Sequence, residues 1–205
     1  MGVASIIKRI VGLTRKVFVI GFGVAINLLK FKYHGVKCES FPRTRGIVVL
    51  SATQKGRIAI GRNVTINSGR RMNPVGMGFQ TALLALRDGK IQIGNNVGMS
   101  NVAIVSMESI TIEDNVMLGN GAVIYDTDFH SMRYEKRCQK YDDDIATKPV
   151  VIKEGAFIGA GAIVLKGVTI GEHSIIGAGS VVTKSIPPHQ VWAGNPARYI
   201  KDTLD

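Results

Sequence analysis

The chain is short of the residues that build disulfide frameworks and local metal sites. Its 205 residues include two cysteines, Cys38 and Cys138, and four histidines. The cysteines form no C-x-x-C motif, and two cannot make a disulfide framework, so we predict a reducing, cytoplasmic location. The histidines show no H-x-H or H-E-x-x-H spacing, and a metal site built from sequence-local ligands is therefore not expected.

Proline and charged residues are also scarce, whereas glycine is abundant. Six prolines accompany 24 glycines, and the glycines follow no G-X-Y period, which excludes collagen. Charged residues make up 20% of the chain and hydrophobic residues 45%, a composition that favours a folded domain over a disordered one. We therefore expect many tight turns around a sizeable core.

The net charge of +11 is concentrated near the N-terminus. Residues 1–45 carry nine Lys or Arg against one acid, Glu39, whereas the rest of the chain carries 17 bases and 14 acids. No dense basic stripe follows residue 45, so a nucleic-acid partner is not expected.

The one marked hydrophobic run lies in the same basic region. Val17 to Leu29 is apolar except for Asn27 and has lysines or arginines on both sides. It is shorter than the about 20 residues of a membrane-spanning helix. No small-x-small cleavage site follows it, which argues against a signal peptide. We predict that residues 3–32 either contact a membrane surface peripherally or form an ordinary helix that covers one end of the core.

The strongest pattern in the chain is a repeat of six residues. An aliphatic side chain recurs at every sixth position over 152–182, and a small or β-branched residue stands two positions before each one. Similar hexads occur over 110–124 and 91–105, and faintly over 58–66. The aliphatic positions of the longest run are Ile152, Ile158, Val164, Ile170, Ile176 and Val182.

A period of six fits neither the 3.6-residue period of a helix nor the alternation of an ordinary strand. It fits a short strand followed by a tight turn, with three such units closing a triangular coil. The aliphatic side chains fill the prism, and the coils stack at the strand spacing of about 4.8 Å. The repeat therefore predicts an all-β protein, a parallel β-helix.

We divide the chain into a basic, apolar N-terminal arm (1–45), a β-helix domain (46–195) and a closing segment (196–205) with a short C-terminal helix. The arm is expected to be helical. The hexads are interrupted at 73–81 and, at greater length, by a polar insertion over 127–148. Long loops on rigid scaffolds often carry binding groups, although a merely tolerated surface loop remains the alternative.

The uninterrupted hexads, the stretch Asp126-Thr127-Asp128-Phe129-His130 and the tail Ala193-Gly194-Asn195-Pro196-Ala197 together resemble a hexapeptide-repeat acyltransferase. The resemblance covers about residues 46–200. The two motifs are typical of the O-acetyltransferase branch that modifies sugars during cell-surface polysaccharide or lipopolysaccharide assembly. The resemblance implies a left-handed β-helix, a homotrimer with active sites between neighbouring prisms, and acetyl-CoA as the donor, with no metal.

His130 is the predicted general base. Imidazole titrates near working pH, so it can remove the acceptor hydroxyl proton during attack on a thioester. Asp126 and Asp128 are predicted to join it, one orienting the imidazole and the other binding an acceptor hydroxyl, because alternate residues of an extended strand share a face. Cys138 is the candidate for a competing covalent mechanism, but nothing around it resembles a nucleophile motif.

The resemblance also implies binding residues. Ser100 and Asn101 are expected at the acceptor site, and Lys166 or Arg198 is a further candidate for the CoA phosphates. The donor is expected to lie along the turns at Gly159, Ala160, Ala178, Thr183 and Lys184.

The sequence therefore predicts transfer of an acetyl group from acetyl-CoA to a hydroxyl of a sugar or lipid-linked saccharide. Three alternatives stay open. The acceptor is another small hydroxyl compound such as an antibiotic, the chain is a non-catalytic β-helix scaffold, or it is a carbonic anhydrase on the same fold, which would need three converging histidines.

Overall fold

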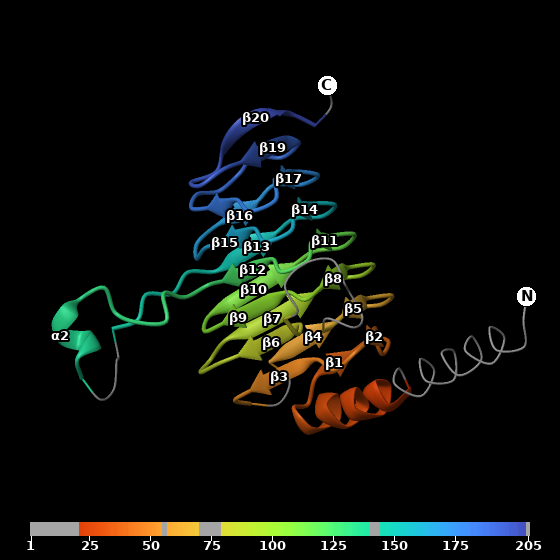
Figure 1. Ribbon diagram of the computed structural model, residues 1–205. Helices are drawn as coiled ribbons and strands as arrows, with labels where there is room; N and C mark the ends of the chain where they lie inside the picture. Colours follow the sequence, from red (N-terminus) through yellow and green to blue (C-terminus); the bar gives the residue numbers. More distant parts are fainter. Residues whose placement is uncertain (1–20, 55–56, 70–78, 140–143, 204–205) are drawn as a thin grey trace, which may run out of the picture.

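The computed structural model describes residues 21–54, 57–69, 79–139 and 144–203, and three stacks of short strands dominate it (Figure 1). Residues 3–20 of the predicted arm lie outside the described part. Each stack forms one wall of a prism, here called walls A, B and C.

The walls are built as follows. Wall A stacks β1 (Lys37–Cys38), β4 (Ile58–Ile60), β7 (Lys90–Ile93), β10 (Ser109–Ile112), β13 (Val150–Ile152) and β16 (Thr169–Ile170). Wall B stacks β2 (Arg43–Arg45), β5 (Thr65–Asn67), β8 (Gly98–Ser100), β11 (Met117–Leu118), β14 (Phe157–Ile158), β17 (Ile175–Ile176), β19 (Gln190–Ala193) and β20 (Arg198–Asp202). Wall C stacks β3 (Val49–Ala52), β6 (Ala82–Ala85), β9 (Ala103–Ser106), β12 (Val123–Tyr125), β15 (Ile163–Val164) and β18 (Val181–Val182).

Each coil of the chain visits walls A, B and C in turn, and each strand pairs in parallel with its counterpart in the next coil. In wall A, for example, Ile110 lies opposite Ile91 of the coil before it and Val150 of the coil after it. The predicted left-handed parallel β-helix is confirmed. The coils begin at β1, before the predicted boundary at residue 46.

The interior of the prism is a column of aliphatic side chains. All six aliphatic positions of the longest hexad run are buried, as the repeat predicts. The small residues two positions earlier are buried too, because the corner leaves little room. Two of them are serines that also tie coils together: Ser174 Oγ donates to Pro187 O at 2.7 Å, and Ser180 Oγ accepts from Gly194 N at 3.1 Å.

One corner of the prism turns on asparagines in the left-handed region. Asn63, Asn96 and Asn115 have φ of 57°, 57° and 60°, a conformation that asparagine tolerates better than most residues. Their side-chain amides stack from coil to coil, with N···O distances of 2.9 and 3.0 Å, and Asn115 continues the ladder to Glu154 at 3.0 Å. The ladder repeats the same turn in register along the prism.

Both ends of the prism are covered. A helix described over residues 21–33 lies across the end formed by β1–β3, which matches the helical arm predicted from the sequence (Figure 1). At the other end the predicted C-terminal helix is wrong, because β20 pairs antiparallel with β19. The last coil leaves the edge of wall B open, and a strand satisfies that edge with backbone hydrogen bonds, whereas a helix would leave it unpaired. Trp192 of β19 is buried there beneath Tyr199.

The insertion leaves the prism between β12 and β13 and projects away from it, carrying the short helix α2 (Tyr134–Arg137) (Figure 1). Cys138 ends this helix and is exposed.

Candidate active site

Asp126 follows β12 and is tied into the protein interior. Its carboxylate is fully buried and accepts hydrogen bonds from Ser106 Oγ at 2.6 Å, Met107 N at 2.7 Å and Glu108 N at 2.9 Å. These three donors belong to the end of β9 and the turn after it, one coil below. The carboxylate of Asp126 therefore joins two coils, and its acceptor positions are directed at the protein rather than at solvent.

The chain then turns, so the extended strand assumed from the sequence is interrupted. Thr127 bridges to Thr147 across the root of the insertion, and Phe129 has a φ of 64°. The Phe129 ring packs edge-on against Tyr125, with centroids 4.9 Å apart, and its N–H donates to Thr127 Oγ1 at 3.1 Å. The structure consequently does not bring Asp126, Asp128 and His130 to one face of a strand.

Asp128 has a different partner from the one expected. Its Oδ1 accepts from Lys166 Nζ at 2.7 Å, and both side chains are about three-quarters buried. Lys166 comes from the next coil, and the sequence suggested it only as a contact for CoA phosphates. Coil register alone does not predict this pair: Ile124 lies opposite Val164, so two further residues place Asp126, and not Asp128, beside Lys166.

His130 is exposed where the insertion leaves the prism. The segment after it is held by local bonds, since Ser131 Oγ lies 3.1 Å from Asp144 Oδ2 and Arg133 pairs with the same carboxylate at 3.5 Å. Arg137 donates to the carbonyl of Ser131 at 2.9 Å. An imidazole on a braced, solvent-facing corner can receive a proton from an incoming hydroxyl.

Thr183 and Lys184 lie at the same corner as His130. They follow β18, which pairs with β15, and β15 in turn pairs with β12. Both residues are exposed, and Lys184 Nζ sits 5.2 Å from the centroid of the Trp192 ring. A cation held over an aromatic face near an open corner is positioned to meet an anionic group.

Ala160 and Ala178 lie at the other corner of wall C. Both are exposed and occupy equivalent turns of successive coils, where Gly179 N donates to the carbonyl of Ala160 at 2.8 Å. Asn120 continues the column, since its carbonyl accepts from Gly161 N at 2.9 Å. From this corner to the His130 corner the chain runs about five residues, or about 15 Å at the rise of a strand.

Gly159 has a packing reason to be glycine. A Cβ at this position would lie 2.5 Å from the carbonyl oxygen of Ile176 and 2.6 Å from Ala178 N, both in the next coil. Coil stacking therefore requires the missing side chain, whether or not a ligand approaches there.

Asn101 and Ser100, the residues predicted to bind the acetyl acceptor, lie at the same corner of the prism as Ala160. Asn101 is 2% exposed, and its amide donates to Asn120 Oδ1 at 2.8 Å and accepts from Gly69 N at 2.7 Å. Its side chain is thus committed to the wall. Ser100 Oγ accepts from Asn67 at 3.0 Å and is only partly buried, so its hydroxyl hydrogen can still be donated outward.

A hollow of about 440 Å³ lies on wall C between these two corners. Its floor is apolar, with Val123 and the small Ala82 and Ala103, and its rim includes Asn101 and Tyr125. The hollow connects Asn101, one of the two predicted acceptor residues, to the strand that leads to His130.

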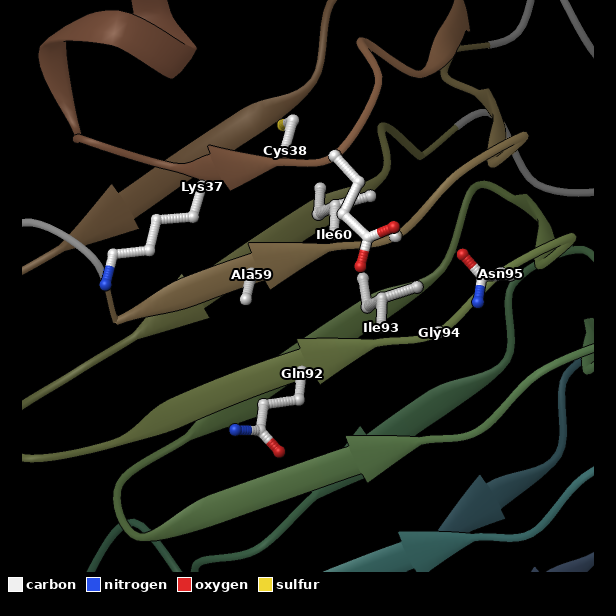
Figure 2. Close-up of a pocket in the computed structure, with 10 residues that line it drawn as sticks. Lys37, Cys38, Ala59, Ile60, Gln92, Ile93, Gly94 and Asn95 are labelled. Atoms are coloured by element: carbon white, nitrogen blue, oxygen red, sulfur yellow. The ribbon is translucent and has the colours of Figure 1, made fainter.

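A second hollow, of about 330 Å³, lies on wall A, away from His130 (Figure 2). Figure 2 shows Lys37 and Cys38 of β1 above Gln92 of β7, with Asn95 at the corner. Burial raises the pKa of the Cys38 thiol, which disfavours the reactive thiolate. Among the described residues no group of three or more His, Cys, Asp or Glu could hold a metal ion, here or elsewhere.

Comparison with known proteins agrees with the repeats. A family model described as bacterial transferase hexapeptide (six repeats) matches residues 149–184, and one described as hexapeptide repeat of succinyl-transferase matches residues 91–126. A search of curated proteins finds no match.

Solved structures share the fold. A hexapeptide-repeat-containing acetyltransferase from Vibrio cholerae is 25% identical, with 87% of this chain and 79% of that chain covered and a TM-score of 0.55. A maltose O-acetyltransferase from Clostridium difficile is 28% identical over 82% and 69% of the two chains, with a TM-score of 0.53. A galactoside acetyltransferase in complex with coenzyme A is 27% identical over 82% and 64%, with a TM-score of 0.52. In its repeats and its coil geometry the chain resembles these hexapeptide-repeat proteins, and the neighbours support an acyltransferase.

Proposed function

We propose that this protein transfers an acetyl group from acetyl-CoA to a hydroxyl of a sugar, with His130 as the general base. The observation that carries the proposal is the exposed imidazole of His130, held where the Asp-x-Asp-Phe-His stretch leaves a rigid prism. The likeness to a maltose O-acetyltransferase and a galactoside acetyltransferase supports the choice of donor and acceptor.

The chemistry follows from this placement. The imidazole of His130 takes the acceptor hydroxyl proton while the oxygen attacks the thioester carbonyl. A C–O bond forms, the C–S bond then breaks, and the imidazolium returns its proton to the leaving thiolate. Asp128, paired with Lys166, fixes the backbone two residues before His130. The reaction is direct, and Cys138 takes no part in it.

A complete site needs residues from both corners of wall C, which a single prism holds about 15 Å apart. We propose that a homotrimer joins the His130 corner of one copy to the Ala160 and Ala178 corner of its neighbour. The outer face of wall C supports this arrangement because it is apolar along the whole stack. Its in-register column comprises Val49, Ala82, Ala103, Val123, Ile163 and Val181.

The first test separates binding from chemistry. His130→Asn and a matched control, His173→Asn at a turn remote from the insertion, are titrated with acetyl-CoA by calorimetry and assayed for transfer to a panel of sugars. We expect both variants to bind acetyl-CoA like the unaltered protein. We expect transfer to fall about 10²- to 10⁴-fold in His130→Asn only. Undiminished transfer by that variant would remove His130 as the base, and absence of acetyl-CoA binding would overturn the proposal as a whole.

The second test addresses the shared site. His130→Asn and Ala160→Trp are expected to be inactive alone, the second because its indole blocks the opposite corner. Co-refolded in equal amounts, they should regain about a quarter of the activity, because one interface in four combines an intact His130 corner with an intact Ala160 corner. No recovery from a mixture that forms trimers would place both corners' functions within one chain.

A further inference from the structure

The N-terminal helix is attached to the prism by one face. Gly23, Asn27 and Phe31 follow one another at four-residue spacing and are buried. Asn27 Nδ2 donates to the carbonyl of Gly46 at 2.9 Å, and Asn27 Oδ1 accepts from Val48 N at 3.0 Å. This face of the helix therefore covers the first coil.

The opposite side of the helix is exposed and apolar, the reverse of an ordinary surface helix. Phe22 is 60% exposed, Leu28 48%, Leu29 71% and Tyr33 77%. Four large, exposed apolar side chains thus lie within three turns of one helix, unlike the scattered single apolar residues of a typical soluble surface. Such a patch is typical of a surface that meets an apolar phase or a partner.

The surroundings of this patch carry charge of one sign. Lys32, Lys37, Arg43 and Arg45 are exposed around the covered end, and the acid of the region, Glu39, is paired with Arg62 at 3.2 Å. The sequence before the helix adds four bases and no acid over residues 1–20. A second copy of this chain would bring the same positive charge to the patch, so self-association through it is electrostatically disfavoured.

We propose that this face docks the protein on an anionic lipid bilayer. The face comprises Phe22, Leu28, Leu29 and Tyr33, together with the exposed lysines and arginines of the same end of the prism. Apolar side chains that enter the headgroup region beside basic side chains that meet anionic lipids are the two attractions that hold interfacial helices. No helix among the described residues is long and apolar enough to cross a bilayer, so the contact is with its surface.

The orientation of the helix suits this contact. It lies across the end of the prism rather than along it, so its exposed side faces outward from that end (Figure 1). A bilayer on this face would run across the prism axis. Strand β12 is three coil spacings above β3, about 14 Å at the strand spacing. If the proposed acetyl transfer holds, His130 would stand within reach of a saccharide carried on a lipid; the docking itself does not depend on that activity.

The test is co-sedimentation of the full chain with vesicles. One set contains phosphatidylcholine with phosphatidylglycerol, the other phosphatidylcholine alone. We expect binding to the anionic set, weaker binding to the neutral set, and loss of binding as salt shortens the Debye length from about 30 Å at 0.01 M to about 3 Å at 1 M. Equal binding to both sets, or none to either, would overturn the proposal.

Point variants then identify the face. Leu29→Ser is compared with Ile200→Ser, a substitution of an isoleucine of β20 that is 58% exposed at the far end of the prism. We expect the partition coefficient to fall about tenfold in Leu29→Ser, the loss that burying one large aliphatic side chain predicts, and to stay unchanged in Ile200→Ser. Lys32→Gln should weaken binding to the anionic set about fivefold.

The alternative occupants give different results. Because all of these side chains are exposed, circular dichroism should confirm that each variant keeps the fold. If Leu29→Ser leaves vesicle binding intact, residues outside this face hold the membrane and the proposal is wrong. If sedimentation velocity shows that Leu29→Ser dissolves a larger assembly while vesicles bind neither form, the patch is a protein interface and not a lipid one.

Discussion

Replacement of Asp126 by alanine should unfold the protein more readily than it changes the chemistry. The carboxylate is fully buried and accepts from Ser106 Oγ, Met107 N and Glu108 N at 2.6 to 2.9 Å. Hydrogen bonds to a charged group contribute about 1.5 to 3 kcal/mol each and are not additive. Removal of the carboxylate leaves three buried donors without an acceptor. We therefore expect a loss of about 3 to 5 kcal/mol in unfolding free energy.

Thermal denaturation at fixed protein concentration measures this loss. For a chain of this length about 2 to 4 °C corresponds to each kcal/mol, so the midpoint should fall by about 10 °C. The midpoint of Asp126→Asn should lie between those of the unaltered protein and Asp126→Ala. Its amide keeps one acceptor oxygen but places an NH₂ donor where one buried N–H needs an acceptor. The control is Asp88→Ala, whose carboxylate is 86% exposed and should cost less than about 1 kcal/mol.

The opposite pattern would contradict a structural role for Asp126. If Asp126→Ala melted like the unaltered protein and lost acetyl transfer, the carboxylate would act on substrate or on His130. The bonds to the turn after β9 would then contribute little to stability.

Other predictions follow from the same geometry. Gly159→Ala should lose about 1 to 3 kcal/mol of unfolding free energy to overpacking, whereas Gly98→Ala, whose new Cβ would meet nothing within 4 Å, should melt within about 0.5 kcal/mol of the unaltered protein. If the 2.7 Å ion pair of Asp128 with Lys166 positions the segment before His130, Asp128→Asn and Lys166→Met should both lower kcat. Urea unfolding should show a loss of at most about 2 kcal/mol in unfolding free energy, and an unchanged kcat would make the pair purely structural. The hydrogen bond from the backbone N–H of Asn95 lowers the pKa of Asp114. A depressed folded-state pKa stabilises above the unfolded pKa, so melting temperatures from pH 7 to pH 3 should fall less steeply in Asp114→Asn than in the unaltered protein, and parallel curves would contradict this.

The coils could be predicted from sequence because the signal is local and periodic. Each hexad is one strand and one turn, so the position of Ile152 determines the role of Ile158 and Val164 without knowledge of distant contacts. The C-terminal helix was predicted wrongly for the converse reason. Whether Arg198–Asp202 forms a helix or a strand depends on the open edge of β19, and that edge exists only once the coils have closed.

The candidate site was predictable in position but not in its contacts. The end of the hexads before residue 127 indicates where His130 leaves the prism. The side chains of Asp126 and Asp128 were expected to meet it by strand alternation, which the positive φ at Phe129 interrupts. A non-glycine residue in that region carries no signature in a single sequence. The ion pair of Asp128 with Lys166 could not be predicted from coil register, because an alignment of the hexads places Asp126, and not Asp128, beside Lys166.

The N-terminal segment shows why two expectations from one pattern need not compete. The apolar run before Leu29 suggested either a membrane contact or an end cap, as if one helix face had to serve a single purpose. The structure gives the capping role to Asn27, the one polar residue in the run, whose amide satisfies a donor at Val48 and an acceptor at Gly46. Because Asn27 and Phe31 make the attachment, Phe22, Leu28, Leu29 and Tyr33 are left on the outside. Their exposure is therefore a consequence of how the helix is anchored, and it is what makes the lipid-docking proposal testable by single substitutions that leave the cap intact.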